Sequence, residues 1–420
     1  MAVTSDELAS TPAARGYLVG LLAFIGFVTL FEGYDLLIIN LALPALGREF
    51  GVDAAVLGKA VGLINVGTIV AFIPVRLADR YGRRRVFLWA IALYTLFTLL
   101  SALSVGLADF VLWQFLARMF MVTEIGVGAI ILTEEMPARW RGAAVTFMFA
   151  LSLAGGILGS ALHPWLAGSE LGWRALYVFG GVVLPVLLLC WPWLRETQRY
   201  AAQKAATARR ESLTALFGAF LALWRSRYRL RVLAGASLWF AVNAWSSSCL
   251  FFFAYYVTNE RQWTPVEISH ALTLAYSLAI VGYVSGGALL DMVGRRVTAS
   301  LFFVTGSTAA WVCFTAHDPV VITTAYVVVL GMHALWPVAA TITSEIFPTE
   351  LRATANALVN NLLGRTGMAL APAIVGVFSV WLGSVGQSVA VVALVPLACL
   401  PIILFAVSES RGQELERLND

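Results

Sequence analysis

The sequence predicts an all-α membrane protein with twelve transmembrane helices in two six-helix bundles (6+6), both termini cytoplasmic. Of its 420 residues 60% are hydrophobic and only 12% are charged, about half the charged fraction of a typical soluble domain. Twelve successive windows are apolar enough to span a bilayer, and two motifs recur at nearly one offset. So few charges cannot cover a soluble globule, which argues against a soluble enzyme or a nucleic-acid-binding protein.

A bilayer core needs about 20 mainly apolar residues per helix. The predicted spans begin near Tyr17, Val56, Val86, Phe110, Ala143, Ala175, Val232, Ile268, Val297, Val320, Ala353 and Val385. One long polar interval separates six spans from six. We therefore expect a cytoplasmic N-terminal tail (1–16), a first bundle (17–194), a cytoplasmic linker (195–231), a second bundle (232–407) and a cytoplasmic C-terminal tail (408–420).

The basic residues give the orientation, because Lys and Arg concentrate on cytoplasmic loops. With both termini inside, the cytoplasmic segments hold 22 of the 28 Lys and Arg residues, and the outer segments hold four: Arg48, Lys59, Arg174 and Arg261. We expect an integral, multi-pass protein of the bacterial cytoplasmic (inner) membrane. The first sixteen residues lack the basic start and A-x-A site of a cleavable signal peptide, which predicts a retained tail.

The partners expected from composition are few. The net charge of +4 reflects the bias toward the inside, so it implies no nucleic acid. The four cysteines lie in separate apolar runs, which suits small hydrophobic side chains better than metal ligands or disulfides. We expect a monomer in the lipid bilayer with a small-molecule substrate, no metal and no cofactor, and a proton as the coupling ion.

The first repeated motif follows the second and eighth predicted spans. L-A-D-R-Y-G-R-R at 77–84 corresponds to L-L-D-M-V-G-R-R at 289–296, with Asp79 and Asp291 separated by 212 residues. A glycine in such a short turn lets two helix ends approach, and its Asp and Arg can interact with neighbouring helix ends. If the arginines of this motif served only to orient the protein in the membrane, the motif would not need an Asp and a Gly in both copies.

The second repeated motif follows the fourth and tenth predicted spans. Glu134-x-x-Pro-x-x-x-Arg141 recurs as Glu345-x-x-Pro-x-x-x-Arg352, and the glutamates are 211 residues apart. Two independent motifs at nearly the same offset predict two related six-helix halves.

The D-R-x-G-R-R element resembles the cytoplasmic loop signature of the major facilitator superfamily. Val75 replaces its leading glycine, whereas the second copy keeps Gly287. The resemblance covers the whole chain and implies a transporter in which these loops latch one bundle to the other. The gating residues expected from it are Asp79, Arg80, Gly82, Arg83, Arg84, Glu134, Arg141, Asp291, Gly294, Arg295, Arg296, Glu345 and Arg352.

Shorter sequence elements indicate which subgroup of the superfamily the chain resembles. E-T-Q-R-Y at 196–200 and the tail at 408–416 resemble elements of sugar porters and organic ion transporters. Glu32-Gly-Tyr-Asp35 is similar to the D-G-[FY]-D element of aromatic acid:proton symporters, with Glu32 in its first position. The seventh span lacks the Q-L-S element of sugar porters. The resemblance therefore favours organic acids over sugars.

Five ionisable residues fall inside predicted spans, where a charge costs several kcal/mol unless it faces a cavity or a partner. They are Glu32, Asp35, Arg118, Glu124 and Arg365. Glu32 and Asp35 share a helix face, and Glu124 is expected near the midplane. We expect Glu124, Glu32 and Asp35 to carry the proton, with Glu124 the first candidate. The alternatives are a structural cap for Glu32 or Asp35 and a structural ion pair for Arg118.

Arg365 is the expected anion site, because a guanidinium can hold a carboxylate in a fork. Organic anion carriers of the superfamily that the chain resembles often place an arginine in this span. The alternative is a salt bridge from Arg365 to Glu124 or Asp35. Asn360 and Asn361, which supply hydrogen-bonding groups around Arg365, are also expected to bind substrate. The other expected substrate-binding residues, each with packing or structure as its alternative, are Arg118, Trp239, Asn243, Tyr276, His333 and Trp336.

These residues predict a secondary active transporter that works by alternating access, with proton-coupled symport of a small organic acid, including aromatic acids, as its function. The alternatives are a proton-coupled sugar or organic cation porter, and a drug or amphiphile:proton antiporter. The fifth span lacks the G-P pair usual in drug antiporters. Neither H-E-x-x-H nor G-x-S-x-G occurs, so no enzyme is expected.

Overall fold

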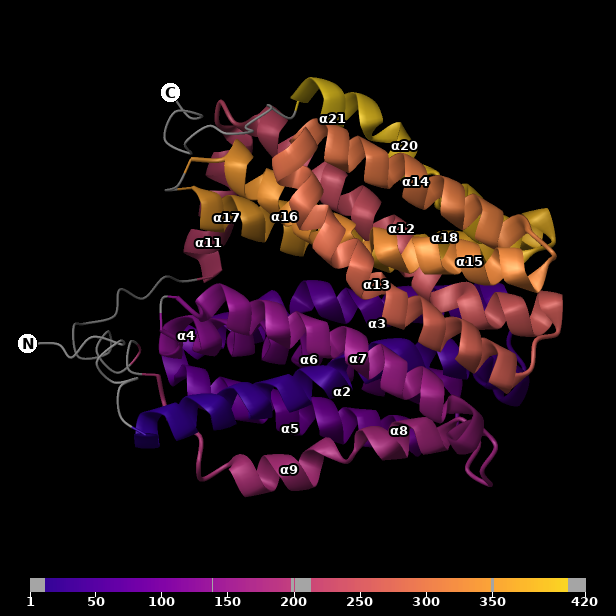
Figure 1. Ribbon diagram of the computed structural model, residues 1–420, viewed down its shortest axis with the longest axis horizontal. Helices are drawn as coiled ribbons and strands as arrows, with labels where there is room; N and C mark the ends of the chain where they lie inside the picture. Colours follow the sequence, from indigo (N-terminus) through magenta and orange to yellow (C-terminus); the bar gives the residue numbers. More distant parts are fainter. Residues whose placement is uncertain (1–11, 138, 198–199, 201–212, 349–350, 407–420) are drawn as a thin grey trace, which may run out of the picture. The chain divides into compact units, whose positions relative to one another are not determined.

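The computed structural model describes residues 12–137, 139–197, 200, 213–348 and 351–406 (Figure 1). These ranges contain helices joined by turns, and no strand occurs in them. Eleven helical stretches among them are long and apolar enough to cross a membrane. They pack into two compact units, one of Met1–Ala42 and Val70–Arg209 and one of Leu43–Ile69 and Arg210–Asp420, which we call the first and second unit.

The first unit is built on a long N-terminal helix. Its elements are α2 (Pro12–Phe50) as far as Ala42, α4 (Phe72–Tyr81), α5 (Arg83–Ala102), α6 (Leu107–Glu135), α7 (Arg141–Ala167), α8 (Arg174–Gly180) and α9 (Val183–Cys190). Gly33 of α2 and Gly155 of α7 let these two helices touch, because a Cβ at either would collide with the other helix's backbone. α5 packs mainly on α6 and α8.

The second unit holds α3 (Ala54–Val70) and the C-terminal half of the chain. Its other elements are α11 (Leu213–Arg225), α12 (Arg229–Arg261), α13 (Pro265–Val293), α14 (Arg295–Thr315), α15 (Pro319–Gly331), η1 (Met332–Ala334), α16 (Leu335–Ile346), α17 (Arg352–Asn356), η2 (Ala357–Gly364), α18 (Arg365–Leu382), α19 (Val385–Val392), α20 (Val395–Ala398) and α21 (Leu400–Ala406). α12 packs on α18 and on η2, which is a π-helix.

Local sequence signals explain where several helices begin. The Thr264 and Glu267 side chains cap α13 reciprocally, with the Glu267 amide 3.3 Å from the Thr264 Oγ1 and the Thr264 amide 2.8 Å from the Glu267 Oε2. Asp318 accepts from the amides of Val320 and Val321 at 2.9 and 3.0 Å at the start of α15. Both helices carry proline in their first position, where no amide donor is needed.

The helices follow the expected spans, with interruptions in the sixth and in the twelfth, which consists of α19, α20 and α21. The sixth span, expected from near Ala175, forms two short helices over Arg174–Cys190 with a turn at Gly181 and Val182. Within the predicted linker, Leu213–Arg225 form the helix α11, while 201–212 lie outside the described residues. The twelve-helix arrangement, the domain bounds and the location of the termini remain predictions.

Candidate functional site

The turn of the loop signature in the first unit requires glycine. Gly82 joins α4 to α5 at φ +103°, a conformation that other residues rarely adopt. A Cβ there would also collide with the carboxylate of Glu196. In the second unit Gly294 joins α13 to α14 at φ +92°. The repeated glycine therefore adopts a positive φ at the equivalent turn in both units.

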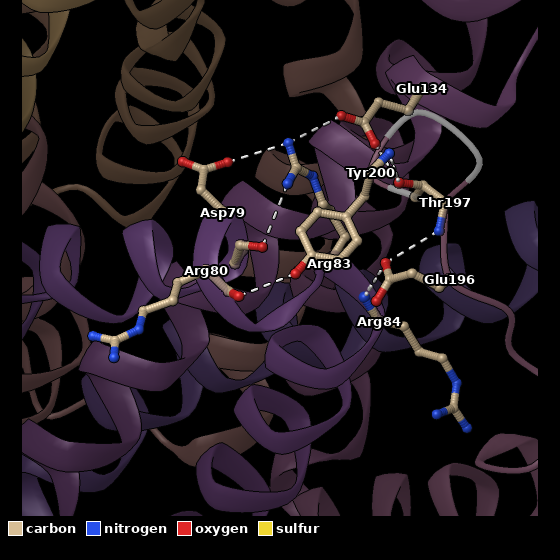
Figure 2. Close-up of polar contacts among 9 residues, drawn as sticks. Asp79, Arg80, Arg83, Arg84, Glu134, Glu196, Thr197 and Tyr200 are labelled. Atoms are coloured by element: carbon tan, nitrogen blue, oxygen red, sulfur yellow. Dashed lines mark hydrogen bonds and ion pairs between the residues drawn. The ribbon is translucent and has the colours of Figure 1, made fainter. Parts of the chain in front are cut away.

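Arg83 is the central cation of the first loop signature (Figure 2). Its Nη2 lies 3.1 Å from Asp79 and 3.4 Å from Glu134, and its Nη1 donates to the Ala78 carbonyl at 3.4 Å. The side chains of Arg83 and Glu134 are only 9% and 13% exposed, whereas that of Asp79 is 71% exposed. The pair of Arg83 and Glu134 is thus the buried one, and it joins the start of α5 to the end of α6.

The second unit contains the same pair in its own copy of the motifs. The Arg295 guanidinium holds Glu345 through Nη2 at 2.8 Å and Nε at 3.0 Å. It also donates to the Leu290 carbonyl at 3.1 Å. This pair joins the start of α14 to the end of α16. Arg83 with Glu134 and Arg295 with Glu345 are therefore equivalent interactions within their own units.

The segment after the sixth predicted span docks onto the first loop signature (Figure 2). The Glu196 Oε1 accepts from the Arg84 amide at 3.0 Å, which caps α5. The Thr197 hydroxyl donates to Glu134 at 2.5 Å, and the Tyr200 hydroxyl donates to the Arg80 carbonyl at 3.0 Å. The family resemblance of the E-T-x-x-Y element does not by itself give these residues a role.

The remaining predicted gating residues differ in their exposure and contacts. Arg141 donates from Nε to the Met136 carbonyl at 3.0 Å. The Arg80 side chain is exposed, and those of Arg296 and Arg352 are half-buried. The side chain of Asp291 lies outside the described residues. The latch between bundles that the resemblance implies remains a prediction.

The first unit buries four of the five ionisable residues predicted within spans. Glu32, Asp35, Arg118 and Glu124 are 4%, 8%, 3% and 0% exposed, and they come from α2 and α6. Arg118 interacts electrostatically with Asp35 and Glu32, and Glu124 interacts with Glu32. The structure therefore brings all three proposed proton carriers and Arg118 into one buried cluster.

The surroundings of the three carboxylates differ. The Thr98 hydroxyl donates to the Asp35 Oδ2 at 3.1 Å, and Ser152 of α7 hydrogen-bonds to Glu32. Neither carboxylate oxygen of Glu124 has a hydrogen-bond partner among the described residues. Glu124 is thus the least satisfied carboxylate of the cluster. The sequence reasoning missed Thr98 and Ser152, because a hydroxyl in an apolar span carries no distinctive signal.

Arg365 in the second unit lies at the junction of the π-helix η2 and α18. Its half-buried guanidinium donates from Nη1 to the Thr68 carbonyl of α3 at 3.2 Å. Its Nε has no hydrogen-bond partner within the described ranges, and neither has the buried Oδ1 of Asn360. Asn361 is half-buried beside it in η2. π-Helical turns are frequent at functional sites, and this one ends at the predicted anion-binding residue.

Two tryptophans stand near this junction. A Cβ at Gly364 would collide with Trp239 of α12, so the chain passes directly against that residue. The Trp239 Nε1 donates to the Thr343 hydroxyl at 2.9 Å, and its ring lies edge-on to Trp336 with 5.7 Å between centroids. Asn243 donates to the Trp239 carbonyl at 2.7 Å. Trp239, Trp336 and Asn243 therefore form one neighbourhood in the second unit, which the backbone meets at Gly364, the residue before Arg365.

His333 and Tyr276 are placed differently. His333 is in the 3₁₀ turn η1, where its Nδ1 lies 3.0 Å from the Val329 carbonyl and its ring packs 4.9 Å from that of Trp245. These contacts fit the structural role left open for it in the sequence. Tyr276 of α13 is buried, with 9% of its surface exposed.

Comparisons with known proteins address the chain as a whole. The sequence profile described as Major Facilitator Superfamily matches residues 25–254 and 240–418. The 3-(3-hydroxy-phenyl)propionate transporter of Escherichia coli is 30% identical over 329 residues, which cover 73% of this chain and 72% of that protein. The 4-hydroxybenzoate transporter of Acinetobacter baylyi is 25% identical over 407 residues, with coverages of 87% and 84%.

A solved structure supports the fold. The xylose transporter of E. coli in an inward open conformation superposes with a TM-score of 0.75 at 17% identity, covering 96% of this chain and 99% of that chain. Together with the eleven apolar helical stretches, these matches agree with the loop signature found in both halves. The chain belongs to the major facilitator superfamily and is an integral, multi-pass membrane transporter, not an enzyme.

Proposed function

We propose that this transporter is a proton-coupled symporter of a small aromatic acid that works by alternating access. The observation that carries the proposal is Arg365, a half-buried guanidinium whose Nε has no partner among the described residues. A carboxylate can bind such a fork with two parallel hydrogen bonds. The tryptophans of the same neighbourhood favour a planar, apolar body over a polyol.

The names of the two relatives support this substrate class. One transports 3-(3-hydroxy-phenyl)propionate and the other 4-hydroxybenzoate, and both compounds join an aromatic ring to a carboxylate. A carboxylate suits Arg365, and a ring suits Trp239 and Trp336. The likeness to a xylose transporter concerns the fold alone.

The proton is proposed to be carried by the buried carboxylates of the first unit, with Glu124 as the principal carrier. Its carboxylate is fully buried, without a hydrogen-bond partner in the described part of the chain and beside Glu32. An unpaired carboxylate in such a place is costly, and protonation removes its charge while the cavity changes sides. Asp35 interacts with Arg118 and Thr98, which supports a positioning role for it.

The architecture proposed for this cycle has twelve spans in two bundles of six, both termini in the cytoplasm and the loop signatures as cytoplasmic latches. The repeated pairs of Arg83 with Glu134 and Arg295 with Glu345 support two related halves. In this proposal the short apolar stretch of α8 and α9, Arg174–Cys190, serves as the sixth span.

The test is uptake of radiolabelled 4-hydroxybenzoate into proteoliposomes under an inward proton gradient. We expect accumulation in wild type and an at least tenfold higher KM in Arg365→Lys, because lysine keeps the charge but loses the planar fork. Xylose is the neutral control and is not expected to be taken up. Equal affinity for 4-hydroxybenzoate in Arg365→Ala and wild type would contradict the proposal.

A further inference from the structure

Two helices far apart in the sequence, α3 and α18, touch through their backbones inside the second unit. A Cβ on Gly62 would lie 2.6 Å from the Ala369 carbonyl oxygen, and one on Gly376 would lie 2.8 Å from the Ala54 carbonyl oxygen. A Cβ on Gly58 would likewise collide with the Pro372 carbonyl. Small residues thus line an antiparallel contact that contains few interlocking side chains.

One side chain in this contact compensates for a missing backbone donor. Pro372 has no amide hydrogen, so it cannot supply the helical hydrogen bond to the Met368 carbonyl four residues earlier. The Nδ2 of Asn65 donates to that carbonyl from α3 at 3.2 Å. Asn65 is fully buried, with 0% of its surface exposed. An apolar residue at position 65 would leave the Met368 carbonyl without this donor.

Arg365 makes the second polar link, one turn further along both helices. Its Nη1 donates to the Thr68 carbonyl at 3.2 Å, three residues beyond Asn65 on α3 and three before Met368 on α18. The two links therefore lie at the same end of the contact, and the small residues make up the rest. Such a contact is held by few directional bonds and can part without withdrawing large side chains.

We propose that α3 and α18 form a clasp that opens and re-forms in each transport cycle, closed by Asn65 on the Met368 carbonyl and by Arg365 on the Thr68 carbonyl. The inference rests on the proposed alternating access, in which the second and eleventh spans belong to different halves. It does not depend on which substrate is carried. In the predicted topology α3 begins at the outer face, so the clasp closes the outer side.

The clasp also links substrate binding to opening. A carboxylate that binds the two terminal nitrogens of Arg365, Nη1 and Nη2, competes with the Thr68 carbonyl for Nη1. The bound anion leaves Asn65 as the remaining polar link. Arg365 then acts both as the anion site and as part of the closure.

The experiment measures distances between spin labels on the two helices by pulsed EPR in lipid nanodiscs. The four native cysteines are replaced by alanine, and labels are placed at Lys59 and Val380, which are exposed and outside the contact. We expect Asn65→Ala to raise the ratio of separated to closed populations by about five- to thirtyfold. Asn259→Ala is the matched control, because Asn259 donates along its own helix, to the Tyr255 carbonyl at 3.1 Å.

A double-mutant cycle separates the clasp from a general loss of packing. Pro372→Ala restores an amide that can bond the Met368 carbonyl within α18, which makes the Asn65 donor redundant. We therefore expect Asn65→Ala to change the population ratio less than threefold when it is combined with Pro372→Ala. An unchanged ratio in Asn65→Ala alone, or the same change in both backgrounds, overturns the proposal.

A bulky substitution in the helix contact provides a second test if Asn65→Ala fails to fold. Gly62→Val places a side chain against the Ala369 carbonyl, and the separated population should rise there too. Uptake of 4-hydroxybenzoate, measured on the same preparations, distinguishes the two proposals. Distances that respond while wild type shows no uptake contradict the substrate but support the clasp, whereas normal uptake with unresponsive distances contradicts the clasp.

Discussion

The Arg83 guanidinium lies 3.4 Å from the Glu134 carboxylate, and both side chains are largely buried where α5 begins and α6 ends. Arg295 and Glu345 repeat this pair at 2.8 Å in the second unit. Arginines that served only to orient the protein would have no need of a buried carboxylate partner. The repeat in the sequence is therefore also a repeat of a specific interaction.

Neutralising either glutamate should destabilise its own unit. We expect Glu134→Gln and Glu345→Gln each to lower the free energy of unfolding by about 1.5–3 kcal/mol, because each removes a charge-assisted hydrogen bond. The measurement is the apparent melting temperature of the purified protein. Glu170→Gln, in an exposed turn, is the control. If all three variants melted at the wild-type temperature, the pairs would make no contribution to stability.

The anchor of the linker should loosen when a single hydroxyl is removed. Tyr200→Phe loses the bond to the Arg80 carbonyl but keeps the ring against Arg83. We expect trypsin to cut the following linker, at Lys204 or Arg209, about two- to fivefold faster, corresponding to the loss of about one hydrogen bond or less. Tyr228→Phe is the comparison, because the Tyr228 hydroxyl accepts a hydrogen bond from the exposed side chain of Arg227. Identical cleavage rates would mean that the Tyr200 hydroxyl does not anchor the segment.

Asp79→Asn should shift the conformational equilibrium of the transporter. If the loop signature latches the cytoplasmic ends together, weakening it lowers the population in which these ends are closed. Labels at Arg85 and Val297, both exposed at helix starts, would report this as a longer mean distance. A distance distribution unchanged from wild type would remove the latch role from Asp79.

Glu124→Gln should uncouple transport from the proton gradient. Glutamine has nearly the same shape but cannot take up and release a proton, so accumulation driven by a pH gradient should be lost. Exchange of labelled for unlabelled 4-hydroxybenzoate, which needs no net proton movement, should persist. Accumulation at the wild-type level would transfer the role to Glu32 or Asp35.

The orientation of the chain can be tested at the linker. A cysteine introduced at Lys204, with the native cysteines replaced, should react with an impermeant maleimide only in inside-out vesicles. Labelling of this cysteine from the outside of intact cells would contradict the predicted cytoplasmic location of the linker. The unsubstituted cysteine-free protein is the control for background labelling.

Patterns carried by contiguous residues were readable from the sequence. The apolar windows found eleven of the expected spans, and the offset of the loop motifs anticipated the paired interactions of Arg83 and Arg295. Burial of Glu32 and Glu124 followed from their place in apolar runs. These features depend on composition and local spacing, which a single sequence shows directly.

Features that depend on long-range contacts were not readable. Asn65 donates to a carbonyl 303 residues away, and its role follows from the proline at 372, which no local pattern connects to it. The sixth span has an apolar composition, yet the chain turns at Gly181 and Val182 and leaves two short helices. A hydropathy plot detects apolar residues, but it does not predict where the helical hydrogen bonds are interrupted.

The π-helical geometry of η2 decides where the eleventh span can lose a residue. A turn closed by i→i+5 hydrogen bonds holds about one residue more than an α-helical turn. Removing one residue from 357–364 can therefore be absorbed by a return to α-helical winding, which keeps Arg365 directed toward Thr68. Removing one residue between Arg365 and Pro372 instead turns Arg365 by about 100° relative to the residues that contact α3. Lineages that carry this arginine should therefore vary in length within 357–364 more readily than within 365–372.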